Sequence, residues 1–116
     1  MGNASESSDF AVVLASLLDL KGISPESAAR MADMSPTYGA GVIGGSRAPT
    51  RDDIVRLALA IAADTASTNG LLGAAGLTEL DPKDARDEIL TNALSSGSSL
   101  RRANVVLVGS GERTLS

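Results

Sequence analysis

The sequence predicts an all-α fold, namely a compact bundle of five short helices with a helix-turn-helix, followed by a sixth helix and a short C-terminal strand or tail. Three observations predict this fold. The hydrophobic residues are almost all aliphatic, because Phe10 and Tyr38 are the only aromatic residues among 116. Helix-start signals recur along the chain, and the apolar residues that follow them repeat at helical spacing. At this length we expect one domain with tails.

Two Ser-Pro pairs define the helix-turn-helix. Ser24-Pro25 and Ser35-Pro36 each place a serine, a favoured N-cap, before a proline that suits the first helical position. The pairs lie eleven residues apart, which leaves room for about two helical turns and a short connection. This spacing predicts two consecutive short helices. Such a unit commonly places its second helix against DNA.

The other helices are placed by their caps and apolar stripes. A first helix is expected to begin at Ser8 or Asp9, because the apolar residues that follow have the i, i+3, i+4, i+7 pattern, and to end at Gly22. Thr50 predicts the start of a fourth helix, and Gly76 predicts the end of a short fifth one. The chain is therefore helical on both sides of the helix-turn-helix.

The expected organisation is a flexible N-terminus at 1–8, a helix-turn-helix domain at 9–78, an additional helix at 79–95, and a linker with a C-terminal tail at 96–116. Within the tail, residues 104–108 read Asn-Val-Val-Leu-Val, a β-branched and aliphatic run that predicts a strand. A single strand needs hydrogen-bond partners. It either pairs with the same strand of a second chain, docks on the helical domain as a tail, or is disordered.

The residue types that most catalysis requires are missing. The chain has no cysteine and no histidine, which excludes disulfides, thiol nucleophiles and the usual zinc ligands. We predict no metal site, no cofactor and no enzymatic activity, and we assign Asp52, Asp53 and Asp87 to helix starts and solvated faces. The segment 39–44 matches G-x-G-x-x-G, but that motif binds dinucleotides only between a buried strand and a helix.

Charge and hydropathy bear on location and partners. Residues 1–9 are polar, and no apolar run approaches the roughly 20 residues of a membrane span, so we expect a cytoplasmic protein without a membrane segment. The net charge of −4 divides into +1 for residues 20–60, with five basic and four acidic residues, and −5 for the remainder, with five and ten. At most about three or four phosphate contacts per copy imply weak non-specific binding to DNA, and a dimer would double the number of contacts.

An ordered set of residues between 10 and 77 resembles a known family. In chain order, the set consists of Gly22-Ile23-Ser24, Ala29, Met34-Ser35, Gly45, Arg47, Pro49-Thr50, Leu71-Leu72 and Ala75-Gly76-Leu77. It is similar to the lambda-repressor-like, Cro/XRE-type DNA-binding domain, and the alignment needs no gap between Gly22 and Thr50. The resemblance implies a small repressor-like transcriptional regulator that binds duplex DNA as a homodimer.

The resemblance also implies which residues meet DNA. Pro25 takes the position that commonly clamps a phosphate, and Pro36, Thr37, Ala40 and Gly41 take the positions that face the major groove. Most of these side chains offer no donor to a base edge, so we expect modest base readout and a strong dependence on DNA shape and backbone contacts. The residues that we assign to DNA are Pro25, Arg30, Ser35, Thr37, Tyr38, Gly41, Arg47 and Arg51.

The glycines of the third helix support a second interpretation. Gly39 stands where the family usually has a large aliphatic residue, and Gly39, Gly41 and Gly44 together would cost on the order of 3 kcal/mol relative to alanine. Either Gly39 and Gly41 let a neighbouring helix pack closely, which we favour, or the glycines leave a bare face for a protein partner. In that alternative, the domain is a protein-interaction module with little or no DNA binding. Its contact residues would be Val42, Ile43, Val105, Val106 and Leu107.

Overall fold

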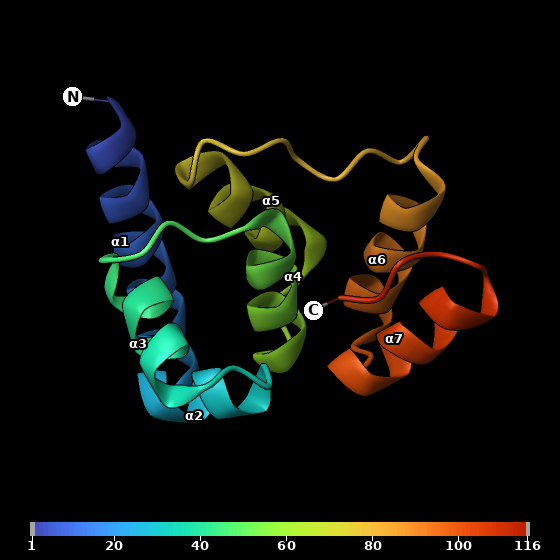
Figure 1. Cartoon of the computed structure of the whole chain (residues 1–116), viewed down its shortest axis with the longest axis horizontal. Helices are drawn as coiled ribbons and strands as arrows, with labels where there is room; N and C mark the ends of the chain where they lie inside the picture. Colours follow the sequence, from blue (N-terminus) through green and yellow to red (C-terminus); the bar gives the residue numbers. More distant parts are fainter. Residues whose placement is uncertain (1, 116) are drawn as a thin grey trace.

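Seven helices and no strand make up the regular structure of residues 2–115 in the computed structural model (Figure 1). Side chains are described from residue 9 onward. The helices are α1 (Gly2–Lys21), α2 (Pro25–Met31), α3 (Pro36–Gly44), α4 (Arg51–Ala60), α5 (Thr65–Ala74), α6 (Ala85–Ser96) and α7 (Leu100–Gly109). The all-α prediction is confirmed for this part of the chain. The helix count and the predicted C-terminal strand are not.

The two Ser-Pro pairs start helices as predicted. The Ser24 hydroxyl accepts a hydrogen bond from the backbone N–H of Ser27 at 3.1 Å, and the Ser35 hydroxyl accepts one from Tyr38 at 3.3 Å. Both helices therefore begin at the proline. The chain turns between them at Asp33, whose φ of 60° lies in the left-handed region that few residues other than glycine adopt.

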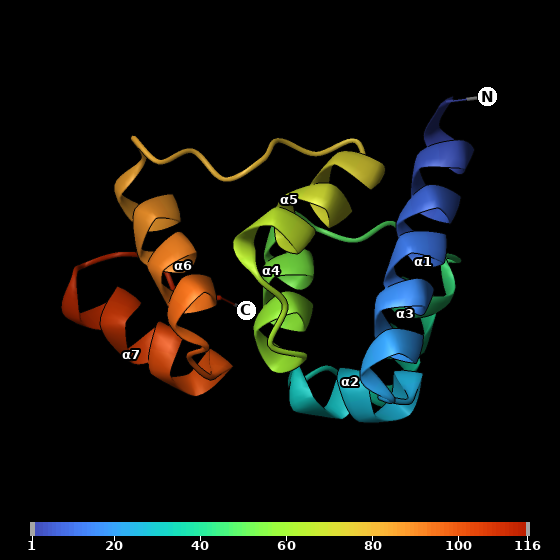
Figure 2. The same cartoon turned by 180° about the vertical axis from the view of Figure 1, so that it is seen from behind.

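Helix α4 lies between the N-terminal helices and the α6–α7 pair (Figures 1 and 2). It contacts α2, α5, α6 and α7, and its Ile54, Val55 and Leu57 are fully buried. Helix α1 packs on α3 and α5, and this contact buries Phe10 and Leu14. One aliphatic core therefore runs from α1 through α4 to α7.

The strand predicted at 104–108 is wrong, because residues Leu100–Gly109 form helix α7, with Ser99 as its N-cap. Ala103 and Leu107 lie four residues apart on the buried face of this helix, 1% and 0% exposed. The β-branched valines give the segment its strand propensity, but that propensity is weak compared with the burial of an apolar helical stripe. As a helix, the segment satisfies its own backbone hydrogen bonds and needs no partner strand.

The structure also describes the two terminal segments of the chain. Helix α1 begins at Gly2, inside the segment 1–8 that we expected to be flexible. The segment after α7, which we expected to be a tail, packs against the domain. The evidence is Leu115, which is only 4% exposed. The Asn104 side chain holds it in place by accepting a hydrogen bond from the Leu115 N–H at 2.8 Å. The C-terminal third of the described chain is therefore part of the fold.

Candidate helix-turn-helix surface

Helices α2 and α3 approach each other closely because Gly39 has no side chain. A Cβ atom at Gly39 would lie 2.5 Å from the Cβ of Ala29, a distance that real Cβ atoms essentially never show. Both residues are buried. The close-packing explanation is confirmed for Gly39: the glycine allows α3 to lie directly on α2.

The other two glycines of α3 have different surroundings. A Cβ atom at Gly41 would lie 3.3 Å from the Cβ of Arg47, so this position tolerates little extra bulk. At Gly44, a Cβ atom would meet nothing within 4 Å. Packing therefore explains Gly39 well and Gly41 in part, but it gives no reason for Gly44.

The outer face of α3, as we use the term, consists of Pro36, Thr37, Ala40, Gly41 and Gly44. Gly41 is half-buried and the other four are exposed. Thr37 contributes a hydroxyl to this face, whereas its neighbours contribute apolar or no side-chain atoms. The face is consequently smooth, with little bulk and little hydrogen-bonding capacity.

Two of the residues assigned to DNA have local structural roles or lack a donor. The Ser35 hydroxyl is engaged as the N-cap of α3. Pro25 is exposed at the start of α2, but proline has no backbone N–H that could bind a phosphate. Pro25 therefore supplies no donor, whereas the Ser35 hydroxyl, whose oxygen accepts the Tyr38 N–H, still has an O–H that can donate.

Tyr38 orients Arg47 beside the outer face of α3. The Tyr38 hydroxyl donates a hydrogen bond to Oδ2 of Asp53, which is 2% exposed and also accepts the Thr50 N–H at 3.0 Å. The hydrogen bond to Asp53, together with burial, raises the pKa of Tyr38 above its usual value. The Arg47 guanidinium lies 5.0 Å from the centroid of the Tyr38 ring, a cation–π arrangement that keeps its donors accessible. Tyr38 therefore contributes to this surface by positioning the guanidinium of Arg47.

Arg51 is occupied by contacts within the domain. Its Nη1 and Nη2 atoms donate to the two carboxylate oxygens of Asp87 at 2.9 and 2.8 Å, and its Nε and Nη2 atoms donate to the carbonyls of Thr78 and Glu79 at 3.0 and 2.7 Å. The ion pair lowers the pKa of Asp87 and raises that of Arg51. These contacts leave the Arg51 guanidinium with little capacity to bind DNA.

A second arginine–carboxylate pair lies next to the first. Arg86 of α6 donates from Nη1 and Nη2 to the two oxygens of Asp52, each at 3.0 Å. Its Nε donates to the carbonyl of Arg113 at 2.8 Å, and its Nη2 also donates to the carbonyl of Thr114 at 3.1 Å. We call the four charged residues that join α4 to α6 the α4–α6 junction: Arg51, Asp52, Arg86 and Asp87. We expected Asp52 and Asp87 at helix starts and on solvated faces, but both are paired with an arginine of the other helix. The sequence did not reveal these pairs, because the partners are about 35 residues apart along the chain.

The remaining arginines near α2 differ in accessibility. Arg56, whose side chain is 11% exposed, donates from Nη2 to the Asp33 carbonyl at 2.6 Å and so supports the turn before α3. Arg30 is exposed and donates to the Ser27 hydroxyl at 3.2 Å. Among the described basic residues of α2, α3 and their connection to α4, Arg30 and Arg47 therefore have accessible guanidinium groups.

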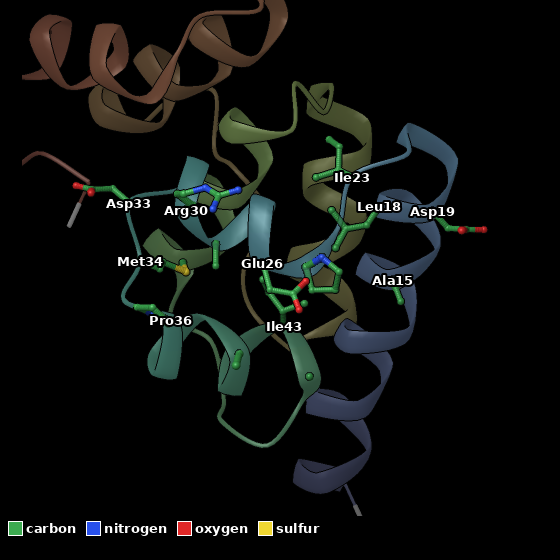
Figure 3. Close-up of a pocket in the computed structure, with 14 residues that line it drawn as sticks. Ala15, Leu18, Asp19, Ile23, Glu26, Arg30, Asp33, Met34, Pro36 and Ile43 are labelled. Atoms are coloured by element: carbon green, nitrogen blue, oxygen red, sulfur yellow. The ribbon is translucent and has the colours of Figure 1, made fainter.

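A hollow of about 780 Å³ lies between α1, α2 and α3 (Figure 3). Buried or half-buried apolar side chains line it, among them Leu18, Ile23, Ala29, Met34 and Ile43. Exposed charged residues also line it, namely Asp19, Glu26, Arg30 and Asp33. The side of α3 next to the hollow carries only Pro36, Ala40 and Gly44 among its exposed lining residues. Small side chains on α3 therefore leave this space open.

The residues assigned to a protein partner are split between core and surface. Val42, Ile43 and Leu107 are 0%, 7% and 0% exposed, so their assignment as partner anchors is corrected: they belong to the core, on the inner faces of α3 and α7. Val105 and Val106 are 65% and 45% exposed on α7. A partner could reach the two valines without any change in the fold.

The sequence matches no protein-family model, curated protein or solved structure with which it was compared. Over residues 2–115, no helix is long and apolar enough to cross a membrane. Among the side chains that the structure describes, from residue 9 to residue 115, no three or more histidine, cysteine or acidic groups cluster so that they could hold a metal ion.

Proposed function

We propose that this protein is a small repressor-like regulator that binds duplex DNA through α2 and α3. The observation that carries the proposal is the α2–turn–α3 unit, in which two capped short helices touch and the second has an exposed outer face. Helix-turn-helix proteins bind DNA with this unit by placing the second helix in the major groove.

The small residues on the outer face of α3 suit close approach to DNA. Without long side chains at Pro36, Ala40 and Gly44, the helix backbone can lie deep in the groove. Thr37 can donate to, or accept from, a base edge or phosphate oxygen, and Arg47 lies beside the helix as a phosphate contact. We infer that specificity depends mainly on DNA shape, because this face has few groups that read bases.

The number of accessible arginines sets the expected salt dependence. Among the described residues of α2, α3 and their connection to α4, Arg30 and Arg47 are the accessible cations, whereas Arg51 and Arg56 of α4 are engaged inside the domain. Two phosphate contacts per copy give a slope of log K against log salt of about −2, and about −4 for a dimer. Binding is therefore expected to be measurable mainly at low ionic strength.

Fluorescence anisotropy with a pool of genomic duplex fragments tests the proposal. Wild-type protein should bind at low salt, and Arg47→Ala should weaken binding and reduce the salt slope by about one. Arg113→Ala is the matched control, because Arg113 is exposed but lies in the C-terminal segment. An absence of salt-sensitive binding by the wild-type protein, even at low ionic strength, would contradict the proposal.

A protein-interaction module is the second candidate, and the apolar hollow between α1, α2 and α3 favours it. Buried apolar side chains below an opening with three carboxylates and one arginine suit a protein segment better than a phosphate backbone. Paired substitutions at Ala40, which is exposed beside the hollow, separate the two functions. Ala40→Arg should strengthen DNA binding and Ala40→Glu should weaken it, whereas both should block a protein segment in the hollow.

A further inference from the structure

Helix α7 is apolar on two sides. Ala103 and Leu107 face the core, while Val105, Val106 and Val108 are 65%, 45% and 65% exposed. A solvated helix usually carries polar residues on its outer side, so three exposed valines within four positions are unusual. Figures 1 and 2 show α7 at the end of the molecule opposite α1, where another molecule can reach it.

The apolar surface continues onto α2. Met31 is 48% exposed, and it lines a second hollow of about 740 Å³ together with Leu100, Val105 and Val108 of α7. We define the α7 outer face as Arg101, Arg102, Val105, Val108 and Gly109, all of them exposed and on one side of the helix, with the exposed Val106 at its flank. With Met31 beside it, this face offers more apolar surface than the valines alone.

The charges at the two ends of α7 have opposite signs. Arg101 and Arg102 lie in its first turn, where positive charge is unfavourable next to the helix dipole. In the described part of the chain, no acidic group lies within ion-pair distance of either guanidinium. Glu112 follows the C-terminal end of the helix, and its N–H donates to the Leu107 carbonyl at 2.8 Å. The helix is therefore positive at its start and negative just beyond its end.

We propose that a second copy of this chain docks on the α7 outer face, so that two α7 helices pair in antiparallel orientation about a two-fold axis near Val105. In this arrangement, Val105 and Val108 of the two copies cover one another. The first turn of each helix lies beside the end of its mate, which brings Arg101 of each copy toward Glu112 of the other. The surface is thus complementary to itself in both hydrophobicity and charge.

Gly109 makes this pairing sterically feasible. With the two-fold axis at Val105, Arg101 of one copy lies opposite Gly109 of the other, because both are four residues from the centre. A Cβ atom at Gly109 would meet nothing within 4 Å in the single chain, so the glycine is not required by internal packing. Its missing side chain leaves space for Arg101 to reach Glu112.

The inference is independent of DNA binding, because the dimer forms through α7 and its measurement needs no DNA. Duplex DNA is the competing occupant, since Arg101 and Arg102 could contact phosphates. Phosphates would not, however, cover Val105 and Val108 or use Glu112, whose negative charge repels them. A second copy accounts for the apolar residues and for both signs of charge.

Sedimentation velocity of the full chain tests the dimer, over concentrations from about 1 µM to about 1 mM to include weak association. Wild-type protein should show a concentration-dependent increase in mass toward the dimer. Val105→Asp combined with Val108→Asp should lower the association constant at least tenfold. Val12→Asp is the matched control, because Val12 is also 65% exposed but lies on α1, and it should leave the association unchanged.

A charge exchange tests the antiparallel pairing without changing the apolar surface. Arg101→Glu and Glu112→Arg should each weaken dimerisation, and the double variant should restore it, because the pair is then reversed in sign. The inference is overturned if wild-type protein remains monomeric throughout the concentration range, if Val12→Asp weakens association as much as the α7 substitutions, or if the double variant fails to restore the dimer. Arg101→Glu variants that lose DNA binding at unchanged mass would assign the face to DNA instead.

Discussion

The outer face of α3 and the α4–α6 junction use neighbouring arginines in different ways. Arg47 lies over the Tyr38 ring with its donors accessible, whereas Arg51, four residues later, donates four hydrogen bonds within the domain. Helices α2 and α3 pack closely because Gly39 has no side chain. The α4–α6 junction, in contrast, is held together by two arginine–carboxylate pairs. Apolar close packing therefore shapes the candidate binding surface, and ionic contacts attach the C-terminal helices.

The largest expected effect is the loss of Arg51. Arg51→Ala leaves the carboxylate of Asp87, whose side chain is 7% exposed, without its main partner, and we expect a destabilisation of about 3 kcal/mol. Arg47→Ala should change stability by less than about 0.5 kcal/mol, because its side chain is exposed. Urea denaturation of both variants measures the difference. Equal stability losses would show that the two arginines do not differ as the geometry indicates.

Glycine-to-alanine substitutions in α3 provide the next largest contrast. Gly39→Ala should destabilise the domain by about 2 kcal/mol, because the new Cβ overlaps Ala29 and two helix backbones must separate. Gly44→Ala adds the same methyl group in open space and should be neutral or stabilise by up to about 1 kcal/mol. Thermal denaturation compares the two variants. A similar gain in stability in both variants would mean that helix propensity and not close packing determines their effects.

The junction should also make stability depend on pH. Because Arg51 lowers the folded-state pKa of Asp87, the ionised carboxylate stabilises the fold above the unfolded-state pKa of about 4. That stabilisation should be lost as the pH falls through the lower folded-state pKa, when Asp87 becomes protonated. The Asp87→Asn variant should be less stable than the wild type near neutral pH. Its free energy of unfolding, measured by urea denaturation, should also fall less between pH 5 and 2, and we call this fall with pH the acid limb. An unchanged acid limb would exclude Asp87 as its cause.

The smallest expected effect is at Tyr38. Tyr38→Phe removes the hydrogen bond to Asp53 but keeps the aromatic ring under Arg47, so stability should fall by about 1 kcal/mol while DNA affinity changes little. Tyr38→Ala removes both interactions and should also weaken DNA binding, because Arg47 is no longer oriented. Anisotropy and urea denaturation on the two variants separate these roles. A strong loss of DNA affinity in Tyr38→Phe would assign the hydroxyl a direct contact.

Local signals in the sequence predicted the helix starts well and the C-terminal segment poorly. Ser24, Ser35 and Thr50 cap helices because their hydroxyls bond to N–H groups three residues away, an interaction contained within the motif itself. The run at 104–108 has a local strand preference, but Ala103 and Leu107 are buried on one helical face. Such burial depends on where other helices lie, so propensity alone could not reveal it.

The sequence by itself determined the all-α class, the positions of α2 and α3, and the lack of cysteine and histidine chemistry, since these follow from composition and from contacts within a few residues. Only the tertiary structure decided that Gly39 serves close packing, that Arg51 is engaged while Arg47 is accessible, and that α7 has an exposed apolar side. The physical reason is distance along the chain. Arg51 and Asp87 are 36 residues apart, and such pairs form only when the packing of whole helices brings their side chains together.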